Sequence, residues 1–223
     1  MTELKKRILT SIFLLFLALS LIFIHHYLFI AGLLMISYMA FYELIFLSLG
    51  IYKKDKKKIL KCFYFNGVAL FYLYVIFAGS CLAIYMHYGP QFFLFLLLIS
   101  IFSDIGGYIF GRIIGGKKLT KISPNKTLSG SAGSFVFSLL PIIIYSIIYN
   151  DQNLYLATNV VFCLLISLST QVGDIFISFL KRKASLKDTG NILPGHGGIL
   201  DRIDGIILAI PFAYFLLAYY KFL

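Results

Sequence analysis

Long apolar runs follow one another along almost the whole chain, and each is close to the length that crosses a bilayer. A bilayer core requires about 20 apolar residues per helix. Of the 223 residues, 60% are hydrophobic and 13% are charged, whereas soluble domains carry about 25% charged residues. Such a chain cannot bury its apolar surface in one aqueous core. The sequence therefore predicts an all-α, polytopic integral membrane protein.

Seven transmembrane helices are expected from the apolar runs. They cover residues 8–24, 28–49, 62–86, 91–114, 129–149, 154–177 and 203–221. The first run is short, and one longer helix or a re-entrant pair would also fit the first 49 residues. The run after Lys5, Lys6 and Arg7 imitates a secretion signal but lacks a small-residue cleavage site, so we interpret it as a retained first helix.

The distribution of positive charge predicts the orientation. All but one of the 20 lysines and arginines lie in four segments, 1–7, 50–61, 112–128 and 178–202. The connections on the opposite side contain no lysine or arginine, which is a strong positive-inside pattern. We therefore expect a cytoplasmic N-terminus, and the net charge of +11 follows from topology and anionic lipid headgroups. Nucleic-acid binding is not expected, because no soluble domain remains to provide it.

The three cysteines lie in or beside apolar runs and share no metal-ligand spacing. We interpret Cys62, Cys81 and Cys163 as small buried apolar residues, with no disulfide, zinc site or redox role.

An aspartate interrupts the apolar run at 91–114. Asp104 costs about 2.5–3.5 kcal/mol at the centre of a membrane helix on insertion scales. It shares one helical face with Tyr108 and Gly111, so its carboxylate can point into the interior of a helix bundle. The neighbouring glycines are also compatible with simple close helix packing.

A polar turn precedes the next run. It comprises Ser123, Pro124, Asn125, Lys126 and Thr127. Backbone N–H groups at a helix N-terminus together with the lysine would bind an anion. An ordinary helix N-cap explains the same residues equally well.

A polar stripe runs along the helix predicted at 154–177 and continues past its end. Its members recur at helical spacing and are Ser167, Thr170, Gln171, Asp174, Ser178 and Lys181. A polar stripe that ends in a carboxylate and a cation suggests a water-accessible site rather than a lipid-facing surface.

A dense block of charged residues and glycines follows the stripe. It contains Lys181, Arg182, Lys183, Lys187, Asp188, Pro194, Gly195, His196, Gly197, Gly198, Asp201, Arg202 and Asp204. The glycines allow the backbone to approach a ligand. Carboxylate oxygens beside phosphate groups favour Mg²⁺ over zinc. A solvated cytoplasmic loop would need the lysines but not the paired aspartates or the His-Gly-Gly turn.

At these residues the chain resembles the phosphatidate cytidylyltransferase family. The resemblance rests on Ser178 to Arg182, Lys187 to Gly190 and the ungapped run from Leu193 to Asp204, supported by Gly173, Asp174 and the turn from Ser123 to Thr127. It covers about residues 100–210, and the first 100 residues match only in being membrane spans. Leu128 and Ser129 stand where family members often carry tryptophan and an acidic residue.

The resemblance implies transfer of a cytidylyl group from CTP to phosphatidic acid, which forms CDP-diacylglycerol and pyrophosphate. It divides the chain into N-terminal structural helices, 1–90, and a catalytic membrane region, 91–223. Asp174 and Asp201 are the expected Mg²⁺ ligands, with room for a second cation. The expected catalytic residues are Asp174, Asp201, Lys181, Arg182 and His196. The expected substrate-binding residues are Asp104, Ser123, Lys126, Thr127, Ser178, Lys187, Asp188, Gly197, Gly198, Arg202 and Asp204.

The resemblance also implies a homodimer in a bacterial plasma membrane, with its active site facing the cytoplasm. Three alternatives stay open from the residues alone. A related enzyme would act on another lipid phosphate, such as an isoprenoid-ether lipid. An ion-coupled transporter would use Asp104 and Asp174 as intramembrane carboxylates, although no inverted repeat is visible. A catalytically inactive scaffold would not need the full charged block.

Overall fold

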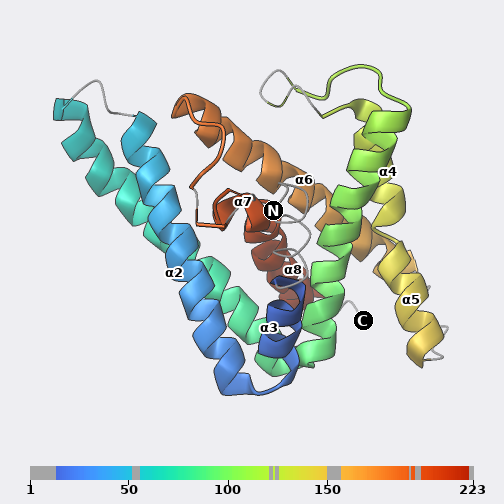
Figure 1. Cartoon of the computed structure of the whole chain (residues 1–223). Coiled ribbons are helices and arrows are strands. Elements are labelled where there is room, and N and C mark those ends of the chain that lie inside the picture. The colour runs from blue at the N-terminus through green and yellow to red at the C-terminus, as the bar shows by residue number, and fades with distance from the viewer. Residues whose placement is uncertain are drawn as a thin grey trace, which may run out of the picture. The chain divides into compact units, whose positions relative to one another are not determined.

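The computed structural model describes residues 14–51, 56–120, 123, 126–149, 157–190, 192–193 and 197–220. Within these ranges the chain is helical and contains no β-strand, only isolated bridges between Lys118 and Thr127 and between Leu193 and Gly197. Figure 1 shows this succession of helices. Helices satisfy all their backbone polar groups internally, which is what an apolar surrounding requires. The all-α prediction is confirmed.

The helices follow the predicted spans closely. An apolar helix, Leu14–Phe23, precedes α2 (His26–Ile51) and α3 (Lys56–Ile113). Next come α4 (Leu128–Phe137), α5 (Leu140–Tyr149) and α6 (Ala157–Lys183). The short α7 (Leu200–Ile203) leads into α8 (Ile206–Tyr220).

Helix α3 contains both the third and the fourth predicted spans. Its apolar part, Leu73–Ile113, has 41 residues, which at 1.5 Å per residue gives about 60 Å, or twice a hydrocarbon core of roughly 30 Å. Gly89 interrupts it with φ 87° and ψ 170°, and Pro90 follows. Proline suits the first turn of a new helix because it lacks an N–H. The break therefore falls between the two predicted spans.

The span predicted at 129–149 consists of two ten-residue helices, α4 and α5. Pro141 lies at the start of α5 and has no N–H to donate to the preceding turn, so it cannot continue α4. Ser138, at the end of α4, donates its hydroxyl proton to the Phe135 carbonyl oxygen. The stretch Leu128–Tyr149 is still long and apolar enough to cross a membrane.

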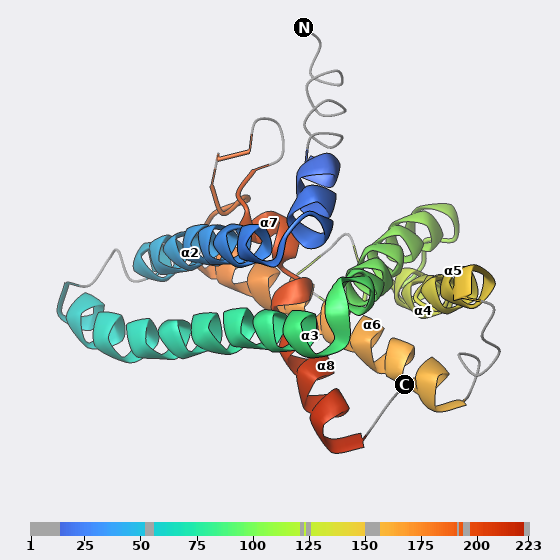
Figure 2. The same cartoon turned by 90° about the horizontal axis from the view of Figure 1, so that it is seen from below.

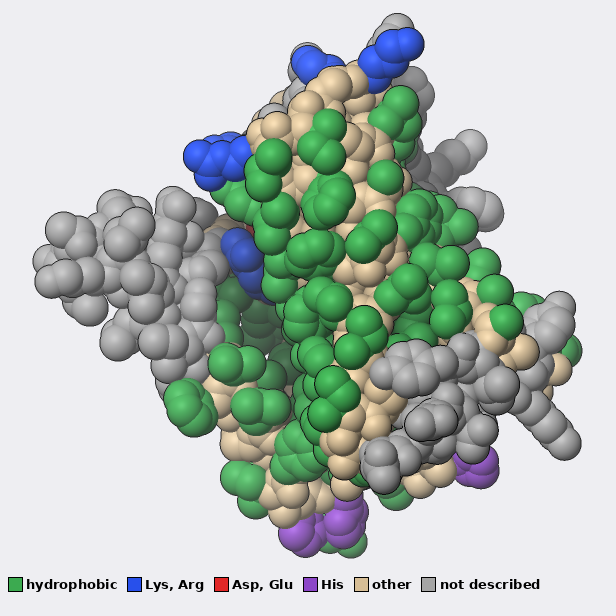
Figure 3. Space-filling view, turned by 90° about the vertical axis from the view of Figure 1, so that its right-hand side faces the viewer, with side chains coloured by type: hydrophobic (Ala, Val, Ile, Leu, Met, Phe, Trp, Pro, Cys, Tyr) green, Lys and Arg blue, Asp and Glu red, His purple; other side chains and the backbone are tan. Residues whose placement is uncertain are grey.

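Four helical stretches of the described chain have the length and composition of a membrane span: His26–Ile51, Leu73–Ile113, Leu128–Tyr149 and Ala157–Lys183. Large apolar side chains are exposed along them, and Figure 3 shows hydrophobic side chains over most of one described face. An exposed apolar surface of this extent needs lipid as its solvent. The protein is an integral membrane protein, whereas the total of seven spans and the cytoplasmic N-terminus stay predictions.

Two compact units make up the chain. The first unit comprises Met1–Leu82 and Leu180–Ile203, and the second comprises Ala83–Phe179 and Asp204–Leu223. In the first unit α2 contacts α7. In the second unit α4 lies beside the C-terminal part of α3, as Figures 1 and 2 show, because facing glycines let the backbones approach. A Cβ on Gly107 would come 2.6 Å from the Ser134 hydroxyl oxygen, and one on Gly130 would come 2.8 Å from the Gly107 carbonyl oxygen.

Two of the three cysteines, Cys81 and Cys163, are free and buried, as predicted. The side chain of Cys62 lies outside the described residues. The functional division at residue 90 stays a prediction.

Candidate active site

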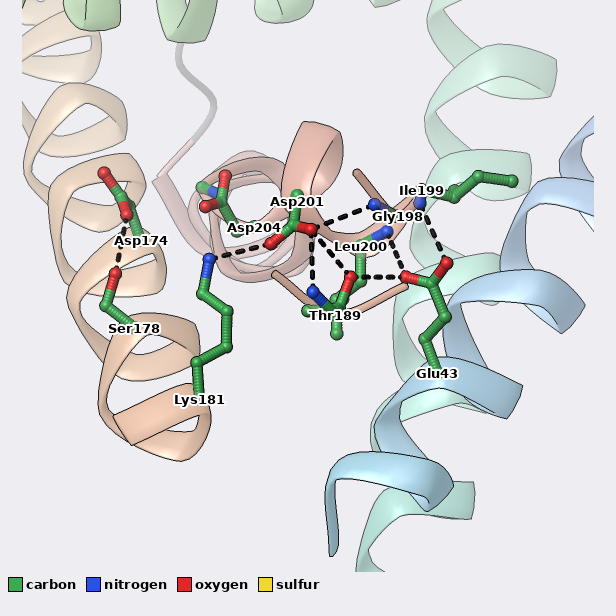
Figure 4. Close-up of polar contacts among 11 residues, drawn as sticks. Glu43, Asp174, Ser178, Lys181, Thr189, Gly198, Ile199, Leu200, Asp201 and Asp204 are labelled. Carbon is green, nitrogen blue, oxygen red and sulfur yellow. Dashed lines mark hydrogen bonds and ion pairs between the residues drawn. The ribbon is translucent and has the colours of Figure 1, made fainter. Parts of the chain in front are cut away.

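Asp201, in α7 of the first unit, is surrounded by hydrogen-bond donors (Figure 4). Its Oδ1 accepts from the Lys181 ammonium at 2.7 Å. Its Oδ2 accepts from the backbone N–H of Thr189 at 2.8 Å and of Gly198 at 3.0 Å. The side chains of Asp201 and Lys181 are only 8% and 13% exposed. Two predicted catalytic residues thus form a shielded ion pair held by the glycine-rich loop.

The protonation of Asp201 follows from these contacts. Burial alone would raise the pKa of its carboxyl group. The hydrogen bond from Lys181, and those from the N–H groups of Thr189 and Gly198, outweigh burial and hold the pKa below its ordinary value. Asp201 is therefore an anion at neutral pH and keeps Lys181 oriented.

Gly197 and Gly198 are needed for this geometry. Gly197 adopts φ 82°, a conformation that favours glycine. A Cβ on Gly197 would come 2.8 Å from Asp201 Oδ2. Gly197 and Gly198 thus let the backbone pass close to the carboxylate.

Glu43 is a buried carboxylate that the sequence analysis missed. It lies on α2 in the first unit, is 3% exposed, and accepts hydrogen bonds from the loop that carries Asp201. The argument applied to Asp104 would have found it, since Glu43 is equally a lone carboxylate inside an apolar run.

Asp174, on α6 in the second unit, is the centre of another ion pair. Its Oδ2 lies 2.5 Å from the Lys126 Nζ, and its Oδ1 accepts from the Ser178 hydroxyl at 3.3 Å. Figure 4 shows the contact between Asp174 and Ser178. The side chains of Lys126 and Asp174 are 24% and 28% exposed. This ion pair is therefore partly open.

The pair of Lys126 and Asp174 borders a pocket of about 310 Å³ in the second unit, lined by both polar and apolar atoms. Its lining residues are Asp104, Gly107, Tyr108, Leu119, Ser123, Lys126, Thr127, Gly130, Ser131, Ser134, Gln171 and Asp174. Five of the predicted site residues, Asp104, Ser123, Lys126, Thr127 and Asp174, thus meet at one cavity. A pocket with hydroxyls, an ammonium group and carboxylates can bind a polar, phosphate-bearing ligand together with a cation.

Backbone hydrogen bonds before α4 hold Lys126 at this pocket. The Leu119 N–H donates to the Lys126 carbonyl at 2.8 Å, and the Lys126 N–H donates to the Ser123 carbonyl at 3.1 Å. Thr127 caps α4, because its hydroxyl oxygen accepts from the Gly130 N–H at 3.0 Å. The N-cap interpretation is confirmed, and the capping residue also lines the pocket.

The polar stripe of α6 has two different environments. Ser167 and Thr170 are fully buried and bond to α3, through Ser103 at 2.8 Å and Ser100 at 3.1 Å respectively. The water-accessible interpretation is wrong for these two residues, because hydroxyls can satisfy one another across packed helices. Gln171 accepts from Ser131 at 2.6 Å and lines the pocket. Only the part of the stripe from Gln171 onward reaches the pocket.

The other predicted residues take no part in these two ion pairs. In the first unit Arg182, Lys187, Asp188 and Arg202 are exposed. In the second unit Asp204 accepts from the Gly205 N–H at 2.9 Å. His196, a predicted catalytic residue, lies outside the described residues.

No group of three histidine, cysteine, aspartate or glutamate side chains is placed to hold a metal within the described residues. Two carboxylates, the Gln171 amide oxygen and several hydroxyls nevertheless share the pocket of the second unit. These hard oxygen donors fit Mg²⁺, which usually takes one or two carboxylates and completes its shell with water and substrate phosphates.

The helical architecture and its apolar surface define the class as an integral membrane protein, and two carboxylate–lysine pairs lie among its motif residues. The profile of the cytidylyltransferase family matches residues 44–220. The chain belongs to this family.

Curated relatives are similar over more than half of the chain. A phosphatidate cytidylyltransferase of Bacillus subtilis (strain 168) is 37% identical over 166 residues, which are 71% of this chain and 61% of the relative. Those of Staphylococcus saprophyticus and Rickettsia bellii (strain RML369-C) are both 42% identical, over 55% and 56% of this chain and 47% and 55% of their own lengths. The chain thus spans about half to three fifths of the curated relatives that it matches.

Proposed function

We propose that this chain transfers the cytidylyl group of CTP to phosphatidate. A phosphate oxygen of phosphatidate attacks the α-phosphorus of CTP, and the bond from that phosphorus to the bridging oxygen of the β-phosphate breaks. CDP-diacylglycerol forms and pyrophosphate leaves with the bond's electron pair. The curated relatives carry this activity in their names.

The observation that carries the proposal is the presence of two carboxylate–lysine pairs, Asp174 with Lys126 and Asp201 with Lys181, in an apolar helical protein. Both pairs consist of residues that resemble the family's motifs. Charge inside such a protein is costly and needs a function to explain it. Bringing two polyanions together is such a function, because two unit charges 4 Å apart repel by about 4 kcal/mol at an effective dielectric of 20.

The basic residues would offset this repulsion. Lys126 faces the pocket and would contact a phosphate there, while Lys181 is oriented by Asp201. The motif block, residues 181–204, supplies three more exposed cations: Arg182, Lys187 and Arg202. They would offset the remaining negative charge of the two substrates. Catalysis of this kind consists mainly of positioning and charge stabilisation.

Mg²⁺ is the proposed cofactor, with Asp174 and Asp201 as its ligands and room for a second cation. Asp174 is partly exposed and borders the pocket, so its carboxylate is accessible to a cation. The oxygens of Asp201 accept from Lys181 and two backbone N–H groups, which Mg²⁺ would have to displace in part. When bound, Mg²⁺ would neutralise triphosphate charge. An increase in thermal stability with Mg²⁺, lost in Asp174→Asn and Asp201→Asn, would support this assignment independently of activity.

The proposed setting is the bacterial plasma membrane, with CTP supplied from the cytoplasm and phosphatidate from the bilayer. The exposed apolar helix surfaces support a lipid-borne substrate. A homodimer is proposed from the family resemblance alone.

Detergent-purified protein, radiolabelled CTP, phosphatidate and Mg²⁺ provide the test. We expect label to enter a chloroform-soluble product in proportion to released pyrophosphate, and Lys126→Ala to reduce its formation. A parallel arm replaces phosphatidate with an isoprenoid-ether lipid phosphate. Exclusive use of that lipid would correct the substrate, and no labelled lipid with either acceptor would overturn the proposed function.

A further inference from the structure

Glu43 is a buried carboxylate that joins the two sequence segments of the first unit, Met1–Leu82 and Leu180–Ile203. Its Oε1 accepts from the Ile199 N–H at 3.0 Å, and its Oε2 accepts from the Leu200 N–H at 2.9 Å. The Thr189 hydroxyl lies 2.6 Å from Oε2. A buried carboxylate is costly unless donors compensate it. The three donors here are neutral groups of the motif block.

Thr189 joins Glu43 to Asp201, as Figure 4 shows. Its hydroxyl oxygen lies 2.6 Å from Glu43 Oε2 and 3.0 Å from Asp201 Oδ2, while its N–H donates to the same Asp201 oxygen at 2.8 Å. A hydroxyl has one proton. Glu43 takes the shorter of its two contacts, so the orientation of this hydroxyl beside Asp201 depends on Glu43.

Two motif glycines leave room for the Glu43 carboxylate. A Cβ on Gly190 would come 2.9 Å from Glu43 Oε1, and a Cβ on Gly198 would overlap the Glu43 carboxylate and the Thr189 hydroxyl. Three hydrogen bonds hold the carboxylate, so it cannot simply swing aside. The same Gly198 donates its N–H to Asp201. Glu43 and Asp201 therefore flank one backbone segment.

We propose that Glu43 is a positioning residue of the cytidylyl transfer: it fixes Thr189 and the Ile199–Leu200 backbone, and through them the orientation of Asp201 and Lys181. This inference rests on the proposed function for its catalytic consequence. Glu43 lies 146 residues before Thr189 in the chain and one residue before the family match begins at residue 44. The N-terminal helices thus contribute a contact to the active site.

The test uses the full-length protein in detergent with Glu43→Gln. Glutamine has the same size but offers one acceptor oxygen and an NH₂ donor, so it cannot accept from all three donors. Asp201 is a proposed metal ligand, and loss of a residue that orients a metal ligand typically lowers activity about 10- to 100-fold. We expect kcat to fall by this factor, with KM for CTP changed less than threefold. The matched control is Ser37→Ala on the same helix, because Ser37 is buried and its hydroxyl has no hydrogen-bond partner in the described structure.

Hydrogen exchange of the Ile199 and Leu200 amides gives a second result that does not depend on activity. We expect exchange at least tenfold faster in Glu43→Gln and unchanged in Ser37→Ala. A kcat within twofold of wild type would overturn the proposal. So would a loss of activity with unchanged exchange, since Glu43 would then act by another route. If wild type makes no labelled lipid, the proposed function fails, and the exchange data still decide whether Glu43 holds the loop.

Thr189 variants keep the proposal testable if Glu43→Gln does not fold. Thr189→Ser keeps the hydroxyl and should retain most of the turnover, whereas Thr189→Val removes it at nearly constant volume and should lose about 10- to 100-fold. Equal activity of the two variants would overturn the proposed connection.

Discussion

The two carboxylate–lysine pairs differ in how their surroundings hold them. Asp201 in the first unit is 8% exposed, and its two oxygens are occupied by Lys181 and by loop N–H groups. Asp174 in the second unit is 28% exposed and borders a pocket. One pair is a fixed part of its loop and the other is accessible to a ligand. Similar charge chemistry can therefore serve orientation at one place and binding at the other.

The largest expected effects come from removing either carboxylate charge. Asp174→Asn and Asp201→Asn should each abolish turnover, and the double variant should be little worse than either single one, because residues that act as a unit are not additive. The two should differ in stability. Asparagine at 201 leaves a shielded ammonium group and a buried N–H poorly paired, which costs about 1–3 kcal/mol. Thermal unfolding should detect this loss in Asp201→Asn and little change in Asp174→Asn.

Near-full activity of either single variant at limiting Mg²⁺ would contradict the two-aspartate proposal, and Asp104 or Asp204 would become the leading ligand. Equal melting temperatures of the two variants would contradict the contrast between a fixed and an open pair. Protein amount and membrane insertion serve as the controls.

The second effect concerns the cations. Lys181→Ala should lower kcat by more than Arg182→Ala, because Lys181 is paired with Asp201 whereas Arg182 is exposed. We expect kcat to fall by about 100-fold in Lys181→Ala, because removing one group that stabilises charge in the transition state typically costs this much. Both should exceed the effect of alanine at Lys53, Lys54, Lys56, Lys57 and Lys58, which the positive-inside pattern explains.

Turnover assays at equal expression would measure this series. Comparable losses from the motif cations and from the lysine run would mean that the anion site has been misplaced.

The sequence predicted the elements better than the contacts. Apolar length places the helices within a few residues, because the bilayer fixes how long a span must be. The Gly89–Pro90 break fell in a predicted connection, but the Pro141 break did not, since proline is tolerated in membrane helices when neighbours satisfy the freed carbonyls.

The motif residues were found because their types are unusual in an apolar chain. Their partners depend on tertiary contacts that spacing does not encode. The apolar run around Glu43 marks it as an unusual carboxylate, but its donors lie about 150 residues away and spacing does not predict them. The stripe of α6 shows the same limit, because only α3 reveals that Ser167 and Thr170 are buried.

A smaller effect is expected from the neutral part of the pocket. Ser131→Ala removes the hydrogen bond to Gln171, which has a length of 2.6 Å. A neutral hydrogen bond contributes about 0.5–1.5 kcal/mol, so KM for CTP should rise by a few fold while kcat changes little. Ser138→Ala is the matched control, because the Ser138 hydroxyl bonds to the Phe135 carbonyl oxygen at the end of α4 and Ser138 does not line the pocket. A reversed order of the two variants would argue against CTP binding in this pocket.

The last prediction concerns orientation, and its variants should leave turnover almost unchanged. Single cysteines are introduced as Lys56→Cys, Lys118→Cys, Leu186→Cys and Asp151→Cys, and a membrane-impermeant thiol reagent is added to intact cells. Of the 20 lysines and arginines, 16 lie in segments 50–61, 112–128 and 178–202, so the first three positions should be cytoplasmic and unreactive. Position 151 should react. Permeabilised cells provide the control, because exposed Lys118 should then react as a cysteine. Labelling of position 186 in intact cells would put the Asp201 loop on the side without CTP, and the proposed reaction could not occur there.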